Sequence, residues 1–198
     1  MSTNASELST EQGQALVRLA RDTLESRLLK APSDHVATKL SDRLSDPALQ
    51  KHSGTFVTLK IGDHLRGCIG SLTGKEPLVE GVRHNALQAA FHDPRFQPLS
   101  RDELEQVAIE ISVLTEPQPL SYTNADDLLT KLRPHVDGVT IHKGFARATF
   151  LPQVWDQLPR AEAFLSHLCM KAGLPADAWQ HGDLEVETYQ VQSFQESV

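Results

Sequence analysis

Two strand-like runs joined by glycine and aspartate constrain the fold of this chain more than any other feature. Residues 55–61 and 64–70 are rich in β-branched and apolar side chains, which suit a half-buried strand. Gly62-Asp63 between them suits a two-residue type II′ turn with glycine first. A loop this short joins antiparallel neighbours, so the sequence predicts a β-hairpin against which other elements must pack.

Position along these strands predicts which side chains share a face. Successive side chains point to opposite faces, so Arg66 and Cys68 should lie on one face of the second strand. With the two-residue turn, Cys68 should lie opposite Val57 and Arg66 opposite Leu59. From alternation and helical period together, largely buried side chains are expected at Phe56, Ile69, Ile109, Ile111 and Leu168.

The order of elements is the same in the two halves of the chain. The hairpin is followed by a helical pattern over 77–91, with Pro77 in its first turn, and by the alternating run "VAIEISVL" over 107–114. The second half repeats this order with strands at 138–142 and 145–151 around the turn Lys143-Gly144, a helix at 160–172 with Gly173 as its αL cap, and a strand at 184–191.

Hairpins with segregated helices predict the fold class. We expect an α+β fold in which helices flank an antiparallel sheet that is barrel-like or strongly curved. Each half, about 54–114 and about 138–192, reads strand, strand, helix, strand. The halves should form two intimate subdomains of a single domain that spans residues 1–198.

Two further segments carry signals for the start of a helix. Ser9 and Gln12 have the spacing of a capping box and leucines at helical period follow, so a helix should cover about residues 9–29. Ser100 and Glu103 repeat that spacing and predict a short helix before the next strand. The polar stretch between the first helix and the hairpin should be a loop with one short helical turn.

Composition excludes several classes of protein. Hydrophobic residues make up 39% of the chain and charged residues 23%, as in a globular protein, and no apolar run is long enough to span a membrane. The first residues lack the basic and apolar regions of a signal peptide, so a cytoplasmic location is expected. The formal net charge of −7, without a Lys or Arg cluster, argues against nucleic-acid binding.

Cys68 is the first candidate for chemistry. It lies in "LRGCIG", where two glycines weaken the strand unless something approaches the backbone closely. The arginine two residues earlier favours a thiolate, so Cys68 could be reactive or face a ligand. The alternative is a small buried side chain, because free cysteines are among the most buried residues. No disulfide or shared metal ion is expected between Cys68 and Cys169.

Glu110 and Arg95 are candidates on a strand and a loop. A carboxylate at Glu110, in the middle of a strand, could act as a general base, hold Arg66 as its counter-ion, or lie exposed. Arg95, the only cation in "DPRFQPL", could bind a carboxylate or phosphate through two hydrogen bonds. That loop could equally be a structural turn.

Two other features have weaker signals. The backbone N–H groups of residues 71–74 could bind an anion ahead of the following helix, or simply connect strand and helix. His167 could line a cleft or lie on the surface. It stands two residues from Cys169 on one helix, so the two side chains diverge and no metal site is predicted.

The hexapeptide "LRGCIG" resembles the signature of the AMMECR domain family, called protein A of the AmmeMemoRadiSam system in microbes. The likeness extends through "FVTL", "DPRFQPL", "EISVL", "LPQVW" and "FLSHLCMKAGL". It implies an α+β fold of two subdomains around an antiparallel sheet, with the hexapeptide near a cleft. Microbial members are encoded beside a Memo-type protein and a radical S-adenosylmethionine protein, which implies a shared modification pathway with these two as partners.

The leading hypothesis is an enzyme, or a subunit of one, that acts on a small molecule or a modified residue. Arg66 would hold an anionic group and favour the thiolate, Cys68 would attack or shuttle protons, and Glu110 would orient Arg66 or take a proton. The alternative is a non-catalytic module that binds a ligand or protein in the same cleft. No cofactor is assigned, and neither metal nor membrane binding is expected. The expected ligand-binding residues are Gly67, Gly70, Arg95 and His167.

Overall fold

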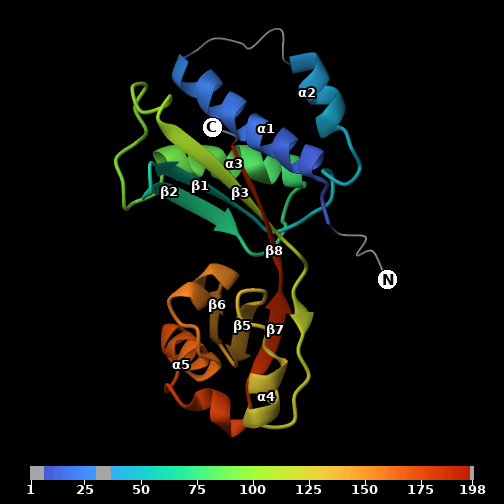
Figure 1. Cartoon of the computed structure of the whole chain (residues 1–198), viewed down its shortest axis with the longest axis vertical. Coiled ribbons are helices and arrows are strands. Elements are labelled where there is room, and N and C mark those ends of the chain that lie inside the picture. Colours follow the sequence, from blue (N-terminus) through green and yellow to red (C-terminus); the bar gives the residue numbers. More distant parts are fainter. Residues whose placement is uncertain (1–6, 30–36, 197–198) are drawn as a thin grey trace. The chain divides into compact units, whose positions relative to one another are not determined.

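The computed structural model describes residues 7–29 and 37–196 and has an α+β fold, as the hairpins predicted (Figure 1). In chain order its helices and strands are α1 (Thr10–Leu29), α2 (Ala37–Leu44), β1 (Thr55–Ile61), β2 (His64–Ser71), α3 (Leu78–Phe91), β3 (Val107–Leu114), β4 (Gln118–Pro119), α4 (Ala125–Lys131), β5 (Gly138–Lys143), β6 (Ala146–Phe150), the 3-10 helix η1 (Pro152–Asp156), α5 (Ala161–Lys171), the 3-10 helix η2 (Ala178–His181), β7 (Glu185–Tyr189) and β8 (Val191–Gln195).

The strands form two four-stranded sheets, in the orders β2-β1-β3-β8 and β4-β7-β5-β6. In each sheet the first hairpin strand lies between its hairpin partner and the strand that follows the helix, so β2-β1-β3 matches β6-β5-β7. The predicted repeat of strand, strand, helix, strand is therefore confirmed. The prediction of a barrel-like sheet is wrong, because the strands between residues 37 and 196 form two open sheets. The alternation of apolar residues along a strand shows which of its faces is buried, but it does not show which strands pair into the same sheet.

The chain divides into two compact units. The first contains everything up to Leu114 together with the residues from Gln192 onward, and the second spans Thr115–Val191. The predicted final strand at 184–191 corresponds to β7, whereas β8 begins at Val191 and was not predicted; β7 pairs in the second sheet and β8 in the first. The apolar positions shift from Leu184 and Val186 to Tyr189 and Val191, so the alternation is interrupted just before the chain passes from one sheet to the other.

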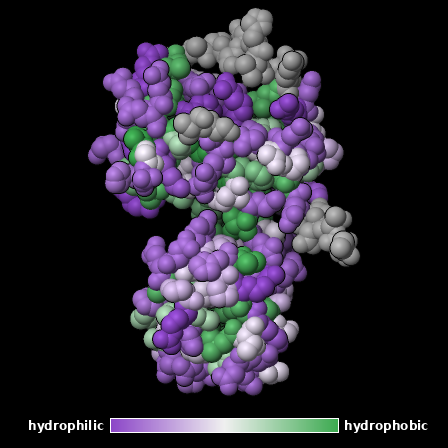
Figure 2. All heavy atoms as spheres, viewed as in Figure 1, coloured by the Kyte–Doolittle hydropathy of each residue, from purple (hydrophilic) through white to green (hydrophobic). Residues whose placement is uncertain are grey.

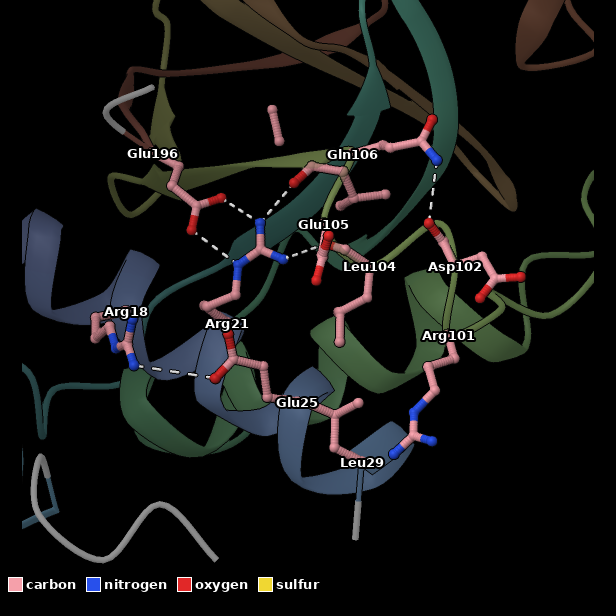
Figure 3. Close-up of a pocket in the computed structure, with 12 residues that line it drawn as sticks. Arg18, Arg21, Glu25, Leu29, Arg101, Asp102, Leu104, Glu105, Gln106 and Glu196 are labelled. Atoms are coloured by element: carbon pink, nitrogen blue, oxygen red, sulfur yellow. Dashed lines mark hydrogen bonds and ion pairs between the residues drawn. The ribbon is translucent and has the colours of Figure 1, made fainter. Parts of the chain in front are cut away.

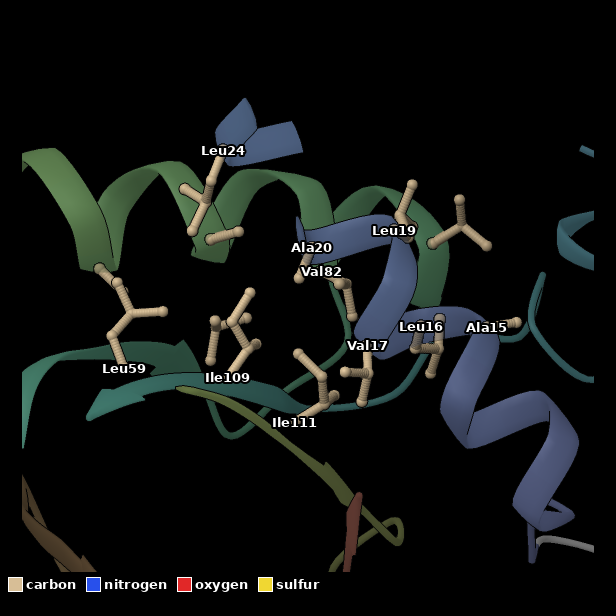
Figure 4. Packing of buried hydrophobic residues seen from close by; sticks show 14 of the residues in the cluster. Ala15, Leu16, Val17, Leu19, Ala20, Leu24, Leu59, Val82, Ile109 and Ile111 are labelled. Atoms are coloured by element: carbon tan, nitrogen blue, oxygen red, sulfur yellow. The ribbon is translucent and has the colours of Figure 1, made fainter. Parts of the chain in front are cut away.

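The core of the first unit lies between the helices α1 and α3 and one face of β1 and β3 (Figures 1 and 4). The predicted capping box starts α1: the Gln12 N–H donates to Ser9 Oγ at 3.2 Å, and the Ser9 N–H donates to Gln12 Oε1 at 2.8 Å. Ile109 and Ile111 are fully buried, as alternation predicted. Figure 4 shows apolar side chains from α1, α3 and both strands meeting in this layer, among them Leu16, Leu24, Leu59, Val82, Ile109 and Ile111.

Burial departs from the prediction at two positions, one on each face of the sheet. Phe56 is half-buried rather than buried, because it points away from the helices that cover Thr55 and Val57. Ile69 is also only half-buried, although it packs against the core. Figure 2 shows a mostly hydrophilic surface in this view, and none of the helices in the described residues is long and apolar enough to cross a membrane.

The second unit has its own core. Trp155 stacks on Phe164, with ring centroids 3.7 Å apart and planes at 7°. Cys169 and Leu168 are fully buried beside them, which confirms a packing role for this cysteine. Gly173, at φ 78°, ends α5 as predicted, and the N–H of Leu174 donates to the Cys169 carbonyl at 2.9 Å.

Some turns and short helices differ slightly from those predicted from the sequence. The second hairpin turns at Gly144-Phe145, one residue later than predicted, because Lys143 pairs with Ala146. The stretch expected to be loop contains the eight-residue helix α2. Residues 101–106 form turns instead of the predicted short helix, although the capping bond from the Ser100 N–H to Glu103 Oε2 forms at 2.9 Å.

Candidate functional site

The strand β2 carries a bulge at Arg66. Gly67 pairs with Leu59 and Leu65 pairs with Lys60, so Arg66 has no partner on β1. The predicted pairing of Arg66 with Leu59 is therefore wrong. A bulge adds one residue to a strand and interrupts its alternation, so a two-residue spacing across it does not place both side chains on one face.

Arg66 binds Glu103 through two hydrogen bonds. Its Nε donates to Oε1 at 2.8 Å and its Nη2 to Oε2 at 3.0 Å. The Arg66 guanidinium, with help from the N–H of Ser100, lowers the pKa of Glu103 to about 2. The Nη1 of Arg66 is buried without a partner among the described residues, and Arg66 lines neither cavity discussed below. This ion pair ties β2 to the turn that precedes β3.

Glu110 does not meet Arg66. Its Oε2 accepts from Lys60 Nζ at 2.8 Å and from Gln195 Nε2 at 3.2 Å. Glu110 pairs across the sheet with Thr58, and Lys60 lies two residues farther along β1, within diagonal reach. The prediction that Glu110 could hold Arg66 is wrong, because a nearer lysine on the adjacent strand takes its carboxylate.

Cys68 pairs with Thr58, one residue from the predicted Val57, as a consequence of the bulge. The Thr58 hydroxyl donates to Cys68 Sγ at 3.3 Å. The Cys68 thiol side chain is partly exposed, so neither the reactive nor the buried alternative follows from burial alone.

The loop after α3 holds the backbone of Cys68. The Cys68 N–H donates to Asp93 Oδ2 at 2.9 Å, and the Cys68 carbonyl accepts from Arg95 Nη2 at 3.2 Å. Arg95 also binds the Asp93 carboxylate through Nε at 2.9 Å and Nη2 at 2.7 Å, and holds the pKa of Asp93 well below its usual range. The two-point carboxylate contact expected of Arg95 is thus made with a residue of the same chain.

Other parts of the same chain pack closely against both glycines of the hexapeptide. A Cβ at Gly67 would lie 2.2 Å from the carbonyl oxygen of Ala89, so α3 packs directly on β2 there. A Cβ at Gly70 would lie 2.3 Å from Cγ of Phe56 on the neighbouring strand. Packing therefore accounts for both glycines, although Gly70 also lines a cavity.

That cavity, which we call the Thr55 pocket, has a volume of about 500 Å³ and lies between the end of β2 and the middle of α3. Thr55 is 3% exposed, and its Oγ1 is buried without a hydrogen-bond partner among the described residues. Asn85 is also buried, and its Nδ2 donates to the Thr55 carbonyl at 3.0 Å. The pocket is lined by Ser53, Thr55, Ile69, Gly70, Ser71, Thr73, Gly74, Lys75, Glu76, Gly81, His84, Asn85 and Gln88.

Sequence reasoning missed Thr55 and Asn85. Asn85 interrupts the apolar face of the helical pattern between Val82 and Ala86, and a polar residue at such a position needs a partner. Thr55 stands in register with the buried Val57 and Leu59, where its hydroxyl would also be buried. Both signals were readable, but only the fold brings them to one cavity.

Several backbone N–H groups at and after the predicted anion site ahead of α3 already donate within the chain. The N–H of Leu78 donates to the Lys51 carbonyl at 2.9 Å, and the N–H of Val79 to the Leu49 carbonyl at 3.3 Å. Within residues 71–74, the N–H of Thr73 donates to Ser71 Oγ at 3.3 Å. The N–H groups of Thr73, Leu78 and Val79 are therefore already hydrogen-bonded within the chain.

A larger cavity of about 860 Å³ lies between α1 and the segment 101–108 (Figure 3). Figure 3 shows Glu196 and the 104–107 backbone directed at Arg21, a buried arginine. Arg21 Nε donates to Glu196 Oε1 at 2.8 Å, and Nη1 donates to the Leu104 carbonyl at 2.7 Å. The buried charge of this cavity, Arg21, is thus hydrogen-bonded within the chain. We therefore place the candidate site at the Thr55 pocket.

His167 is not brought to the hexapeptide. It lies exposed on α5 in the second unit, and it makes no hydrogen bond or ion pair with the rest of the described chain. Between residues 37 and 196 and over 7–29, the structure contains no group of three or more His, Cys, Asp or Glu placed to hold a metal ion.

Comparison with known proteins identifies the family. The AMMECR1 family model matches residues 17–194, which includes β1, β2 and β3 and the Thr55 pocket. The chain belongs to the AMMECR1 family. A protein of Thermofilum pendens is 40% identical over 96% of this chain and 92% of its own length, and one of Methanothermobacter thermautotrophicus is 39% identical over 96% of both.

A solved structure supports the same AMMECR1 fold. The crystal structure of the uncharacterised protein PH0010 from Pyrococcus horikoshii superposes with a TM-score of 0.77 at 33% identity, covering 96% of this chain and 94% of that one. These relatives' names state no activity. In this AMMECR1 chain the hexapeptide is engaged in packing and backbone hydrogen bonds, and an unsatisfied buried polar group that borders a cavity lies next to it at Thr55.

Proposed function

We propose that this AMMECR1-family protein binds a small molecule in the Thr55 pocket. The observation that carries the proposal is the buried Thr55 hydroxyl, which lacks a partner at the wall of a cavity of about 500 Å³. A buried polar group left unpaired costs roughly 1–3 kcal/mol, and a ligand that bonds to it would recover that free energy. Small-molecule sites have volumes of roughly 300–1,000 Å³ with a few placed polar groups, which this pocket matches.

The placement of the predicted catalytic residues favours binding over catalysis. Nucleophilic catalysis needs a base within hydrogen-bond reach of the nucleophile. In the described part of the chain, Cys68 Sγ contacts the Thr58 hydroxyl, while Arg66 binds Glu103 and Glu110 binds Lys60. These pairs do not converge on one reacting centre. Chemistry at Cys68, a cytoplasmic location, and a pathway shared with Memo-type and radical S-adenosylmethionine proteins stay predictions.

A capture experiment tests the proposal. The purified protein is equilibrated with a small-molecule extract of cells and desalted, and retained molecules are released and identified by mass spectrometry. Gln88 lines the pocket and its side chain makes no hydrogen bond within the described chain, so Gln88→Trp should fill the pocket and abolish retention. Gln106→Trp, which alters the larger cavity, is the matched control and should retain the molecule.

Equal retention by wild type and Gln88→Trp would overturn the proposal, provided that both proteins melt at similar temperatures. Retention lost only in Gln106→Trp would place the binding site in the larger cavity and would also contradict the proposal.

A further inference from the structure

We infer that the Thr55 pocket recognises a neutral amide edge, meaning an N–H and a C=O side by side, as in a primary carboxamide or a lactam ring. This inference rests on the proposed function and specifies the chemical class of the ligand. It follows from which donors and acceptors remain open at the buried end of the pocket, and from where the charges lie.

The buried end of the pocket offers two unoccupied polar groups. Asn85 Nδ2 is committed to the Thr55 carbonyl at 3.0 Å, which orients the carboxamide and leaves Asn85 Oδ1 as an acceptor without a partner in the described chain. Thr55 Oγ1 can donate or accept, because the hydroxyl hydrogen rotates. The Asn85 side chain is held beside Thr55 by its bond to the Thr55 backbone carbonyl. A ligand N–H directed at Asn85 Oδ1 and a ligand C=O directed at the Thr55 hydroxyl would satisfy both groups.

Charge is absent from the buried end and mixed at the mouth. Lys75 and His84 are exposed lining residues, and Glu76 is a half-buried one of opposite sign to Lys75. A charged ligand group beside Thr55 would lose its hydration without a buried counter-charge, which is strongly unfavourable. The first N–H groups of α3, at Leu78 and Val79, already donate to backbone carbonyls and cannot compensate an anion. The group that enters deepest is therefore neutral.

Gly81 keeps space open beside Thr55. It lies within α3 and its φ is not positive, so the backbone does not require glycine there. Glycine destabilises a helix relative to alanine, yet a Cβ at this position would lie 3.0 Å from Thr55 Cγ2. Ile69 and Gly70 form the facing strand wall. The small surfaces of Gly70 and Gly81 and the apolar side chain of Ile69 suit a flat group such as an amide or a lactam ring.

The test uses nicotinamide and uracil as probes, with nicotinate as the isosteric anion. Amide resonances of the full-length protein are followed by NMR during titration. Nicotinamide and uracil should each give saturable shifts at Thr55, Gly70 and Gly81, and nicotinate should bind at least about tenfold more weakly, the equivalent of one lost hydrogen bond. Thr55→Val should weaken both amides by about tenfold, because it removes the hydroxyl and keeps the side-chain shape.

Two further variants make the outcome decisive. Thr58→Val, on the opposite face of β1, should bind both amides as wild type does. Should Thr55→Val fail to fold, Gly81→Ala serves in its place and should weaken both probes by narrowing the same end of the pocket. Absence of saturable shifts with either amide, or tighter binding of nicotinate, would overturn the inference. A ligand captured by wild type and lost in Gln88→Trp would leave the proposed function standing in either case.

Discussion

The carboxylate of Asp93 accepts a hydrogen bond from the backbone N–H of Cys68 at 2.9 Å. Cys68 lies on β2, an edge strand of the first sheet, where one row of backbone groups lacks a strand partner. Arg95 donates to the Cys68 carbonyl, so the two side chains together replace one pair of ladder hydrogen bonds. The loop thereby covers an edge on which another chain could otherwise pair.

Replacing Asp93 should weaken this cover. Asp93→Asn removes a buried charge that accepts from Cys68 and from Arg95, and we expect a loss of about 1–3 kcal/mol in the free energy of unfolding. Urea unfolding followed by circular dichroism measures it. Asp63→Asn, at the exposed tip of the first hairpin, is the matched control and should stay within about 0.5 kcal/mol of wild type. An unchanged unfolding midpoint for Asp93→Asn would contradict the structural role.

The ion pair between Glu103 and Arg66 should make stability depend on pH. The folded pKa of Glu103 is lowered from 4.5 to about 2 by Arg66, so its stabilising contribution is present above about pH 4.5 and is lost as the pH falls toward 2. Glu103→Gln should therefore lower the urea midpoint at neutral pH, and its difference from wild type should shrink near about pH 3. Glu105→Gln, which changes an exposed neighbour, should show neither effect. A difference that is constant with pH would argue against the pair.

Gly67 should tolerate no side chain. Gly67→Ala would place a Cβ 2.2 Å from the Ala89 carbonyl oxygen, so α3 would have to move away from β2. Overpacking of this kind typically costs about 1–3 kcal/mol, measured as a lower melting temperature and urea midpoint. Cys68→Ala, the adjacent change that adds no atoms, should cost less. If Gly67→Ala were as stable as Cys68→Ala, close packing of α3 would not be the reason for this glycine.

The two cysteines should differ in reactivity. Cys169 is fully buried, and burial raises the pKa of its thiol, so little thiolate is available for alkylation. Cys68 is partly exposed and receives a hydrogen bond from Thr58, so iodoacetamide should label Cys68 faster in the native protein. Peptide mass spectrometry over time gives both rates. Equal rates, or faster labelling of Cys169, would refute this order and end the case for nucleophilic chemistry at Cys68.

Local sequence was sufficient for most of the longer elements of this protein, but it did not predict α4, β4 or β8. Residues close along the chain interact through fixed backbone geometry, so the period of the apolar positions and the spacing of caps predict structure directly. The Ser9–Gln12 capping box, the glycine cap at Gly173 and the alternation around Ile109 all formed as predicted. The hexapeptide likewise led to the family that the comparisons show.

Tertiary structure alone decided which residues meet. Arg66 found Glu103 and not Glu110 because one extra residue in β2 redirected it, and Lys60 took Glu110 because β1 lies beside β3. The pocket at Thr55 required a helix and a strand edge separated by thirty positions to close on each other, as the Asn85–Thr55 bond shows. Ion pairs and hydrogen bonds depend on distances of a few ångströms between segments far apart in sequence. Those distances are set by packing and register, which no local pattern encodes.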